Sequence, residues 1–121
     1  MSQKKRYHIH ISLVRNENVN LENALEFALS TDYFLTWDLL ATHTNFVEYS
    51  RQQIDQCDYM IFILGNDYGH LSLSGVSYLH LSYIYASSKR VPMIALVNTQ
   101  PSQHELLRQR LDLFNLVIKE Q

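Results

Sequence analysis

The stretch Asp58-Tyr59-Met60-Ile61-Phe62-Ile63-Leu64-Gly65 decides the fold of this 121-residue chain. Residues 59–64 carry no charge, and a glycine ends the run. A continuous apolar run of this length is typical of a strand that is covered on both faces, as in parallel sheets. Residues 91–97 form a second such run, with Pro92 near its start, where a strand tolerates proline. Together the two runs predict a buried parallel sheet.

The rest of the chain predicts strands and helices in alternation. Residues 7–14 alternate apolar and polar side chains, and residues 33–37 are aromatic and β-branched, so both segments are expected to be strands. Apolar spacing and capping residues predict helices at about 20–30, 45–56, 77–88 and 103–119. With right-handed crossovers, this order predicts a flavodoxin-like three-layer α/β/α fold with a parallel sheet of four or five strands, order 2-1-3-4(-5). No linker or repeat interrupts the pattern, so residues 1–121 are expected to be one domain.

Composition and charge limit the classes of partner. Hydrophobic residues make up 46% of the chain and charged residues 18%, which is a globular composition. The net charge of −2 gives no basic surface for nucleic acid, and no apolar run approaches the ~20 residues of a membrane span. The single cysteine, Cys57, is interpreted as a buried apolar thiol, which fits a reducing compartment. With no signal peptide in evidence, the expected location is cytoplasmic.

In open parallel sheets, ligands bind beyond the carboxyl ends of the strands. That rule selects a candidate cleft before any motif is consulted, formed by Ser12, Arg15, Asp38, Gly65, Asp67, Tyr68 and Ser77, with Asn98 following the last strand. Neither a dinucleotide fingerprint nor a P-loop is present, so no cofactor is predicted. His8 and His10 share one strand face without a third ligand nearby in the sequence; they are interpreted as packed residues rather than a metal site.

The most specific motifs are the run 50–59, the segment 63–69 (Ile-Leu-Gly-Asn-Asp-Tyr-Gly), Gly75-Val76-Ser77-Tyr78, and residues 83–86. With these the chain resembles a TIR-like domain family of unknown function, distantly related to nucleoside deoxyribosyltransferases. That resemblance implies a domain at the N-terminus of larger signalling proteins, beside NACHT or other STAND-type NTPase modules, with roles that include defence. It also implies a native protein that continues beyond residue 121.

The helix at 77–88 departs from the resembled enzymes, in which a glutamate faces the sugar. Here Leu79, His80, Ser82 and Ile84 stand at the corresponding positions, and no acid occurs between Asp67 and Glu105 in the sequence. This departure from the resembled enzymes therefore favours a domain without glycosidic chemistry.

Residues 68–88 carry no formal charge, and the helix within them is apolar or aromatic in nearly every direction. This pattern predicts an interface formed by Tyr78, Leu81, Tyr83 and Tyr85. The predicted function is a non-enzymatic signalling or assembly module that acts by self-association or through a protein partner. The alternative is a nucleotide- or nucleoside-binding domain, of NAD-like ligands for example, or an N-glycosidic hydrolase. In that alternative Arg15 would meet a phosphate, and Asp38 or Asp67 the ribose hydroxyls.

Overall fold

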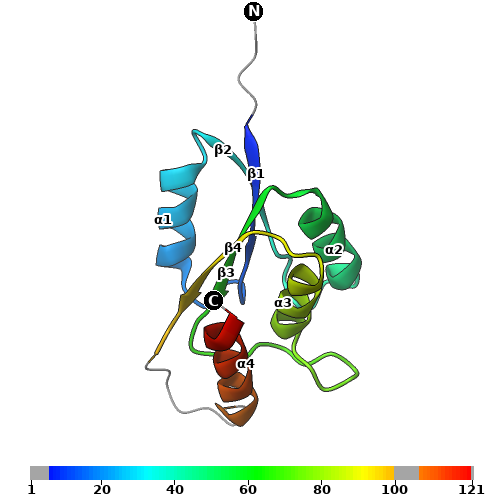
Figure 1. Cartoon of the computed structure of the whole chain (residues 1–121). Helices are drawn as coiled ribbons and strands as arrows, with labels where there is room; N and C mark the ends of the chain where they lie inside the picture. The colour runs from blue at the N-terminus through cyan, green and yellow to red at the C-terminus, as the bar shows by residue number, and fades with distance from the viewer. Residues whose placement is uncertain (1–5, 100–106, 121) are drawn as a thin grey trace, which may run out of the picture.

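A computed structural model describes residues 6–99 and 107–120 of the chain (Figure 1). Its elements, in chain order, are β1 (Tyr7–Ser12), α1 (Val19–Leu29), β2 (Tyr33–Trp37), α2 (Phe46–Gln56), β3 (Tyr59–Leu64), α3 (Tyr78–Ser88), β4 (Met93–Val97) and α4 (Leu107–Glu120). All strand pairs are parallel and the sheet order is β2-β1-β3-β4, so the predicted flavodoxin-like order is confirmed with four strands.

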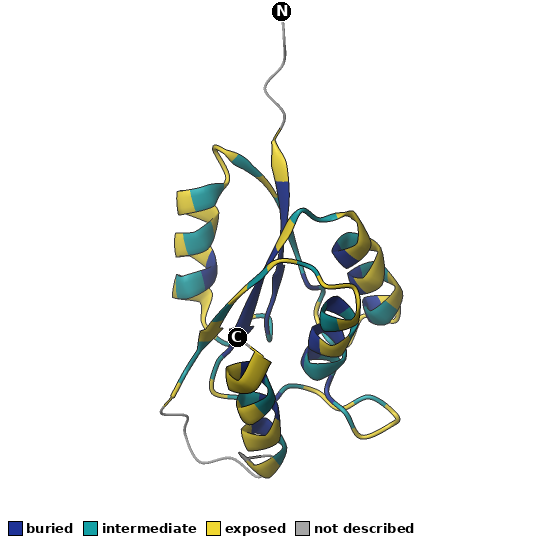
Figure 2. Cartoon of the chain, viewed as in Figure 1, coloured by how far each residue is buried: buried dark blue, intermediate teal, exposed yellow. Residues whose placement is uncertain are grey.

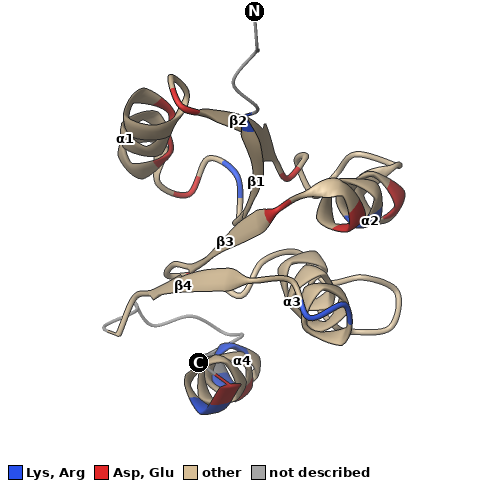
Figure 3. Ribbon diagram, turned by 45° about the horizontal axis from the view of Figure 1, so that its top comes forward, with Lys and Arg blue, Asp and Glu red and all other residues tan. Residues whose placement is uncertain are grey.

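The helices divide unequally between the two faces of the sheet. Figure 3 shows α1 alone on one side, over β2 and β1, with α2, α3 and α4 on the other. Right-handed crossovers explain this division, because the chain steps one way from β1 to β2 and then back the other way to β3 and β4. The face beneath α1 is called here the α1 face, and the opposite one the α3 face.

Each face has its own core, and strand alternation sorts the residues between them. Figure 2 shows the buried residues on the strands of the sheet and on parts of the helices. On the α3 face, Met60, Phe62 and Leu64 pack against residues of α2, α3 and α4. On the α1 face, Ile61 and Ile63 pack with apolar residues of β1, and leucines of α1 lie against them. The central strand β3 is therefore buried on both sides, as its continuous apolar run predicts.

Local capping chemistry fixes the helix starts. Asn18 caps α1, since its side-chain oxygen accepts from the Leu21 backbone N–H at 3.1 Å. Ser77 caps α3 in the same way, with its hydroxyl accepting from the His80 N–H at 3.1 Å, so the helix begins at Tyr78. Asn45 precedes α2, but its side chain makes no capping bond.

Two strand boundaries differ from the sequence prediction. The first strand ends at Ser12 rather than residue 14, because Val14 lies in the turn that leads to α1. The fourth strand begins at Met93, after the proline. The predicted start of the last helix, at 103, lies outside the described residues.

Candidate functional site

The predicted cleft residues do gather at the carboxyl ends of the strands, but the structure divides them into separate clusters. Ser12 and Asp38 belong to a buried cluster under the α3 face. The Asp38 carboxylate accepts from Ser12 Oγ at 2.6 Å, from His10 Nε2 at 2.9 Å and from Ser50 Oγ at 3.1 Å. All four side chains are buried, and their polar atoms are hydrogen-bonded to one another.

The two strand histidines extend this cluster along β1. His10 donates from Nε2 to the carboxylate, so in the neutral ring its Nδ1 accepts from the Thr36 hydroxyl at 2.8 Å. The Thr36 oxygen then accepts from His8 Nε2 at 2.7 Å. Burial lowers the pKa of His8, with His10 as a further lowering influence. The two histidines and Thr36 thus form a hydrogen-bonded chain that ends on Asp38.

Arg15 lies beside this cluster, and its guanidinium forms an ion pair and a hydrogen bond with groups of the same chain. Its Nε donates to the Glu22 carboxylate at 2.9 Å, and its Nη1 donates to the Asp38 backbone oxygen at 2.8 Å. The guanidinium also lies over the Trp37 ring, 5.6 Å from its centroid. The residue that was predicted to meet a phosphate therefore ties the end of β2 to α1.

Tyr68 and Ser77 form another buried cluster at the start of α3. The Tyr68 hydroxyl accepts from the Ser77 backbone N–H at 3.2 Å and is hydrogen-bonded to His80 Nδ1 at 2.7 Å. Burial lowers the pKa of His80, with Asp112 raising it in part. This cluster fixes the loop that precedes the helix.

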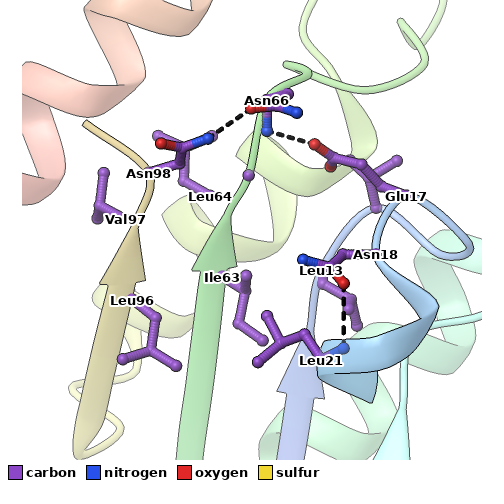
Figure 4. A pocket seen from close by; sticks show the side chains of 12 residues that line it. Leu13, Glu17, Asn18, Leu21, Ile63, Leu64, Asn66, Leu96, Val97 and Asn98 are labelled. Carbon is purple, nitrogen blue, oxygen red and sulfur yellow. Dashed lines mark hydrogen bonds between the residues drawn. The ribbon is translucent and has the colours of Figure 1, made fainter. Parts of the chain in front are cut away.

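The third group is Gly65 and Asp67, and Gly65 lines a cavity of about 340 Å³ on the α1 face. Figure 4 shows how Glu17 reaches over the end of β3 toward it. Its carboxylate accepts hydrogen bonds from the backbone N–H groups of Asn66 and Asp67, the latter at 3.1 Å. Burial raises the pKa of Glu17, and these two backbone hydrogen bonds lower it in part.

Arg110 is a second residue of this region that the sequence reasoning did not select. It is buried, and its guanidinium donates from Nε and Nη2 to the Gly65 backbone oxygen at 2.9 and 2.7 Å. Nη2 also donates to the Asn98 backbone oxygen at 2.6 Å. A buried cation thus joins the ends of β3 and β4 to α4, and the only sequence signal for it is a charge within the apolar stripe of that helix.

The predicted α3 interface requires a correction at Tyr83. That side chain is fully buried, with its ring 5.0 Å from that of Phe62 and its hydroxyl donating to Glu120 at 2.6 Å. It faces the sheet because α3 packs between α2 and α4 on this face, and so it belongs to the core. Leu81 is half-buried against α2.

The other two predicted interface tyrosines are half-buried and already have contacts. The Tyr78 ring packs against Phe46 at 5.1 Å between centroids. The Tyr85 hydroxyl donates to Asp55 at 2.8 Å, and the Arg51 guanidinium lies 5.1 Å from the ring centroid. Most of the aromatic surface of α3 therefore packs against α2, which leaves Ile84 as its exposed large apolar residue.

A larger exposed apolar surface lies on the α1 face, at β4. Ile94 is 64% exposed and Leu96 41%, and next to them Tyr59 is 45% and Tyr7 49% exposed. These four residues, which we call the open sheet face, are brought together by the strand register, with Ile61 opposite Ile94 and Tyr59 opposite Ile9. A hollow of about 570 Å³ lies at their amino-terminal end. Figure 3 shows no described helix over β4 on this side.

Two searches of the described residues, 6–99 and 107–120, bear on the class of protein. They contain no group of three or more His, Cys, Asp or Glu side chains placed to hold a metal ion. Within the same ranges, every helix is too short or too polar to cross a membrane.

Comparison with known proteins places the chain in a family but not with a characterised relative. No curated protein and no solved structure matches it significantly. A family model described as a domain of unknown function, DUF4062, matches residues 15–118, which include every helix and three of the four strands in full or nearly so. The chain therefore belongs to the DUF4062 family.

Proposed function

We propose that this domain is a non-enzymatic assembly module that associates with a second copy of itself through the open sheet face. The observation that carries the proposal is the exposure of Ile94 and Leu96 on a strand with no charged residue. Parallel sheets are normally covered on both faces, and exposed apolar patches of this kind mark interaction sites. The sequence resemblance to TIR-like domains of STAND-type signalling proteins supports an assembly role.

The exposed area predicts a weak dimer. The exposed fractions of Tyr7, Tyr59, Ile94 and Leu96 add up to about two whole side chains. Burying one whole apolar side chain contributes ~1.5–3 kcal/mol, so two copies together would gain ~6–12 kcal/mol. Association itself costs ~4–15 kcal/mol. The largest net gain is therefore ~8 kcal/mol, a dissociation constant near ~1 μM, and the proposal requires a net gain of at least ~4 kcal/mol, a constant near ~1 mM.

The charge distribution suits two identical surfaces meeting. Like charges that face each other across an interface oppose association. Two copies of an uncharged face can meet without this repulsion. Figure 3 shows that β4 contains neither acidic nor basic residues, whereas the charged residues lie mainly on α1, α2 and α4. The outer edge of β4 pairs with no other described strand, so a copy has backbone groups as well as side chains to meet.

Sedimentation-velocity ultracentrifugation over a concentration series tests the proposal. The wild-type chain is expected to associate reversibly toward a dimer, and Ile94→Glu to remain monomeric because it places two carboxylates in the contact. Ile84→Glu is the matched control, since Ile84 is 46% exposed on α3, across the sheet. A wild-type chain that stays monomeric near 1 mM would overturn self-association. Loss of association in the control alone would assign it to α3 instead.

The nucleotide-binding and hydrolase alternatives receive less support at the predicted cleft. The polar atoms of Ser12, Asp38 and Arg15 bond to groups within the chain, and the first two side chains are fully buried. A ligand there would have to break these bonds before making its own. The proposed function therefore contains no chemical step.

A further inference from the structure

Two successive backbone amides at the end of β3 converge on one carboxylate oxygen. The N–H groups of Asn66 and Asp67 both donate to Glu17 Oε1, and Glu17 comes from a loop about fifty residues earlier in the chain. Consecutive amides that point at one centre form a concave anion-binding site, of the kind that receives phosphate in many proteins. In this structure the anion that fills it is a side chain of the protein itself.

The position of Gly65 shows how closely the anion approaches. A Cβ atom built on Gly65 would lie 2.6 Å from Glu17 Oε1 and 2.8 Å from Oε2, a distance that real Cβ atoms do not show. The missing side chain is thus what lets a carboxylate lie directly over the end of the strand. A phosphate oxygen needs the same space.

Electrostatics at this point has two opposing contributions. The Arg110 guanidinium bonds to the Gly65 oxygen beneath the cradle, and its charge favours an anion there, because it lowers the pKa of Glu17. The Asp67 carboxylate opposes it by raising that pKa. The guanidinium bonds to the backbone oxygens of Gly65 and Asn98 and not to Glu17, so none of these bonds is lost when another anion replaces Glu17.

The cradle opens onto the 340 Å³ cavity, whose walls can receive an organic group. Figure 4 shows aliphatic side chains from α1, β3, β4 and the segment that follows β1 around it. Its apolar lining residues are Leu13, Val14, Leu21, Ile63, Leu64, Leu96 and Val97. An apolar chamber with a few polar groups at one end is the usual form of a small-molecule site. It also lies at the carboxyl ends of β1 and β3, where the strand order reverses.

We propose that Glu17 stands in for the phosphate of a phosphate-monoester ligand, which displaces it from the amides of Asn66 and Asp67 and places its organic group in the adjoining cavity. Glu17 then acts as a self-supplied competitor that keeps the site closed to weak ligands. The site uses none of the residues of the predicted cleft except Gly65 and Asp67. The proposal is independent of self-association, and its failure would leave that proposal untouched.

Binding of adenosine 5′-monophosphate (AMP), followed by calorimetry and by amide NMR shifts, tests the proposal. Glu17→Ala empties the cradle and is expected to bind AMP at least tenfold more tightly than the wild type, with the largest shifts at Asn66 and Asp67. Glu17→Gln keeps an acceptor oxygen over the cradle and should bind closer to the wild type. Glu48→Ala, which removes an exposed carboxylate of α2, is the matched control and should leave affinity unchanged.

Separate probes distinguish the cradle from the cavity. Adenosine, which lacks the phosphate, is expected to bind the Glu17→Ala variant at least tenfold more weakly than AMP. If inorganic phosphate binds this variant as tightly as AMP does, the cavity does not bind the organic group, and that part of the proposal is overturned. A folded Glu17→Ala variant that shows neither heat nor shifts at Asn66 with millimolar AMP would overturn the proposal as a whole.

Discussion

Replacing Asp38 by alanine should destabilise the fold more than any single serine replacement in the same cluster. The substitution removes the acceptor of three buried hydrogen bonds, from His10, Ser12 and Ser50. Each buried donor left without a partner costs ~1–3 kcal/mol, so the expected loss is ~3–6 kcal/mol after some relaxation. A domain of this length has a free energy of unfolding of roughly 6–18 kcal/mol, so a large fraction of it would be lost.

Urea unfolding at pH 7, followed by circular dichroism, measures this loss as a shift of the midpoint at constant m-value. Ser50→Ala is the matched control, because it removes one donor and leaves the carboxylate with two, for an expected loss of ~1 kcal/mol. The reasoning is refuted if Asp38→Ala loses less than ~1.5 kcal/mol, or no more than the control. Either result would mean that water can accept the hydrogen bonds of the three donors in place of the Asp38 carboxylate, with little loss of stability.

Two further predictions concern titratable side chains. Burial raises the pKa of the Glu17 carboxyl above its ordinary value of about 4.5, so the folded state keeps the carboxyl protonated to higher pH than the unfolded state does. The free energy of unfolding should therefore fall as the pH rises from about 4.5 through the raised pKa. Urea unfolding at several pH values should show this fall in the wild type and not in Glu17→Gln; parallel curves would contradict it. Burial also raises the pKa of Cys57 to about 11, against 9.0 ordinarily, so at pH 8 its thiolate fraction should be ~100-fold below that of a free thiol. Its rate with a disulfide reagent should fall accordingly, and a rate within tenfold of free cysteine would contradict the prediction.

The sequence predicted the sheet well because strand burial leaves a local mark. The run 59–64 is apolar at every position, and β3 is the strand with a core on each face. The run at β4 looks the same in the sequence, yet Ile94 and Leu96 are exposed. An apolar pattern shows which faces would gain from being covered. Whether a helix reaches a given face depends on the direction of the crossovers, which local periodicity does not contain.

Tyr83, which was predicted to lie at an interface, is buried for a related reason. A helix that is apolar all round indicates burial on several sides, but not by which element. The polar ends of Tyr83 and Tyr85 bond to Glu120 and Asp55, which are distant in the sequence. These contacts arise only once α2 and α4 pack on either side of α3.

The candidate site shows the same limit. The rule for parallel sheets predicted that Ser12, Arg15 and Asp38 lie at the carboxyl ends of the strands, and they do. Their mutual hydrogen bonds satisfy the groups that a ligand would otherwise meet. Glu17, which lies in a polar turn, lines the cavity nearby, and Arg110, which lies in an amphipathic helix, bonds to the Gly65 oxygen at its edge. Neither position carries a motif, and only Gly65 after the strand marked a place of close approach.

The cavity and the open sheet face share one side chain. Leu96 lines the cavity beside Ile63, and it is also exposed on the surface proposed to meet a second copy. A ligand in the cavity and a second copy on the face would therefore contact the same residue of β4. We expect this shared contact to couple the two events, and linkage then requires the ligand and the second copy to change each other's affinity by the same factor, in either direction. Sedimentation of the Glu17→Ala variant with and without AMP measures that factor, and an unchanged dissociation constant would show that Leu96 transmits nothing between the two.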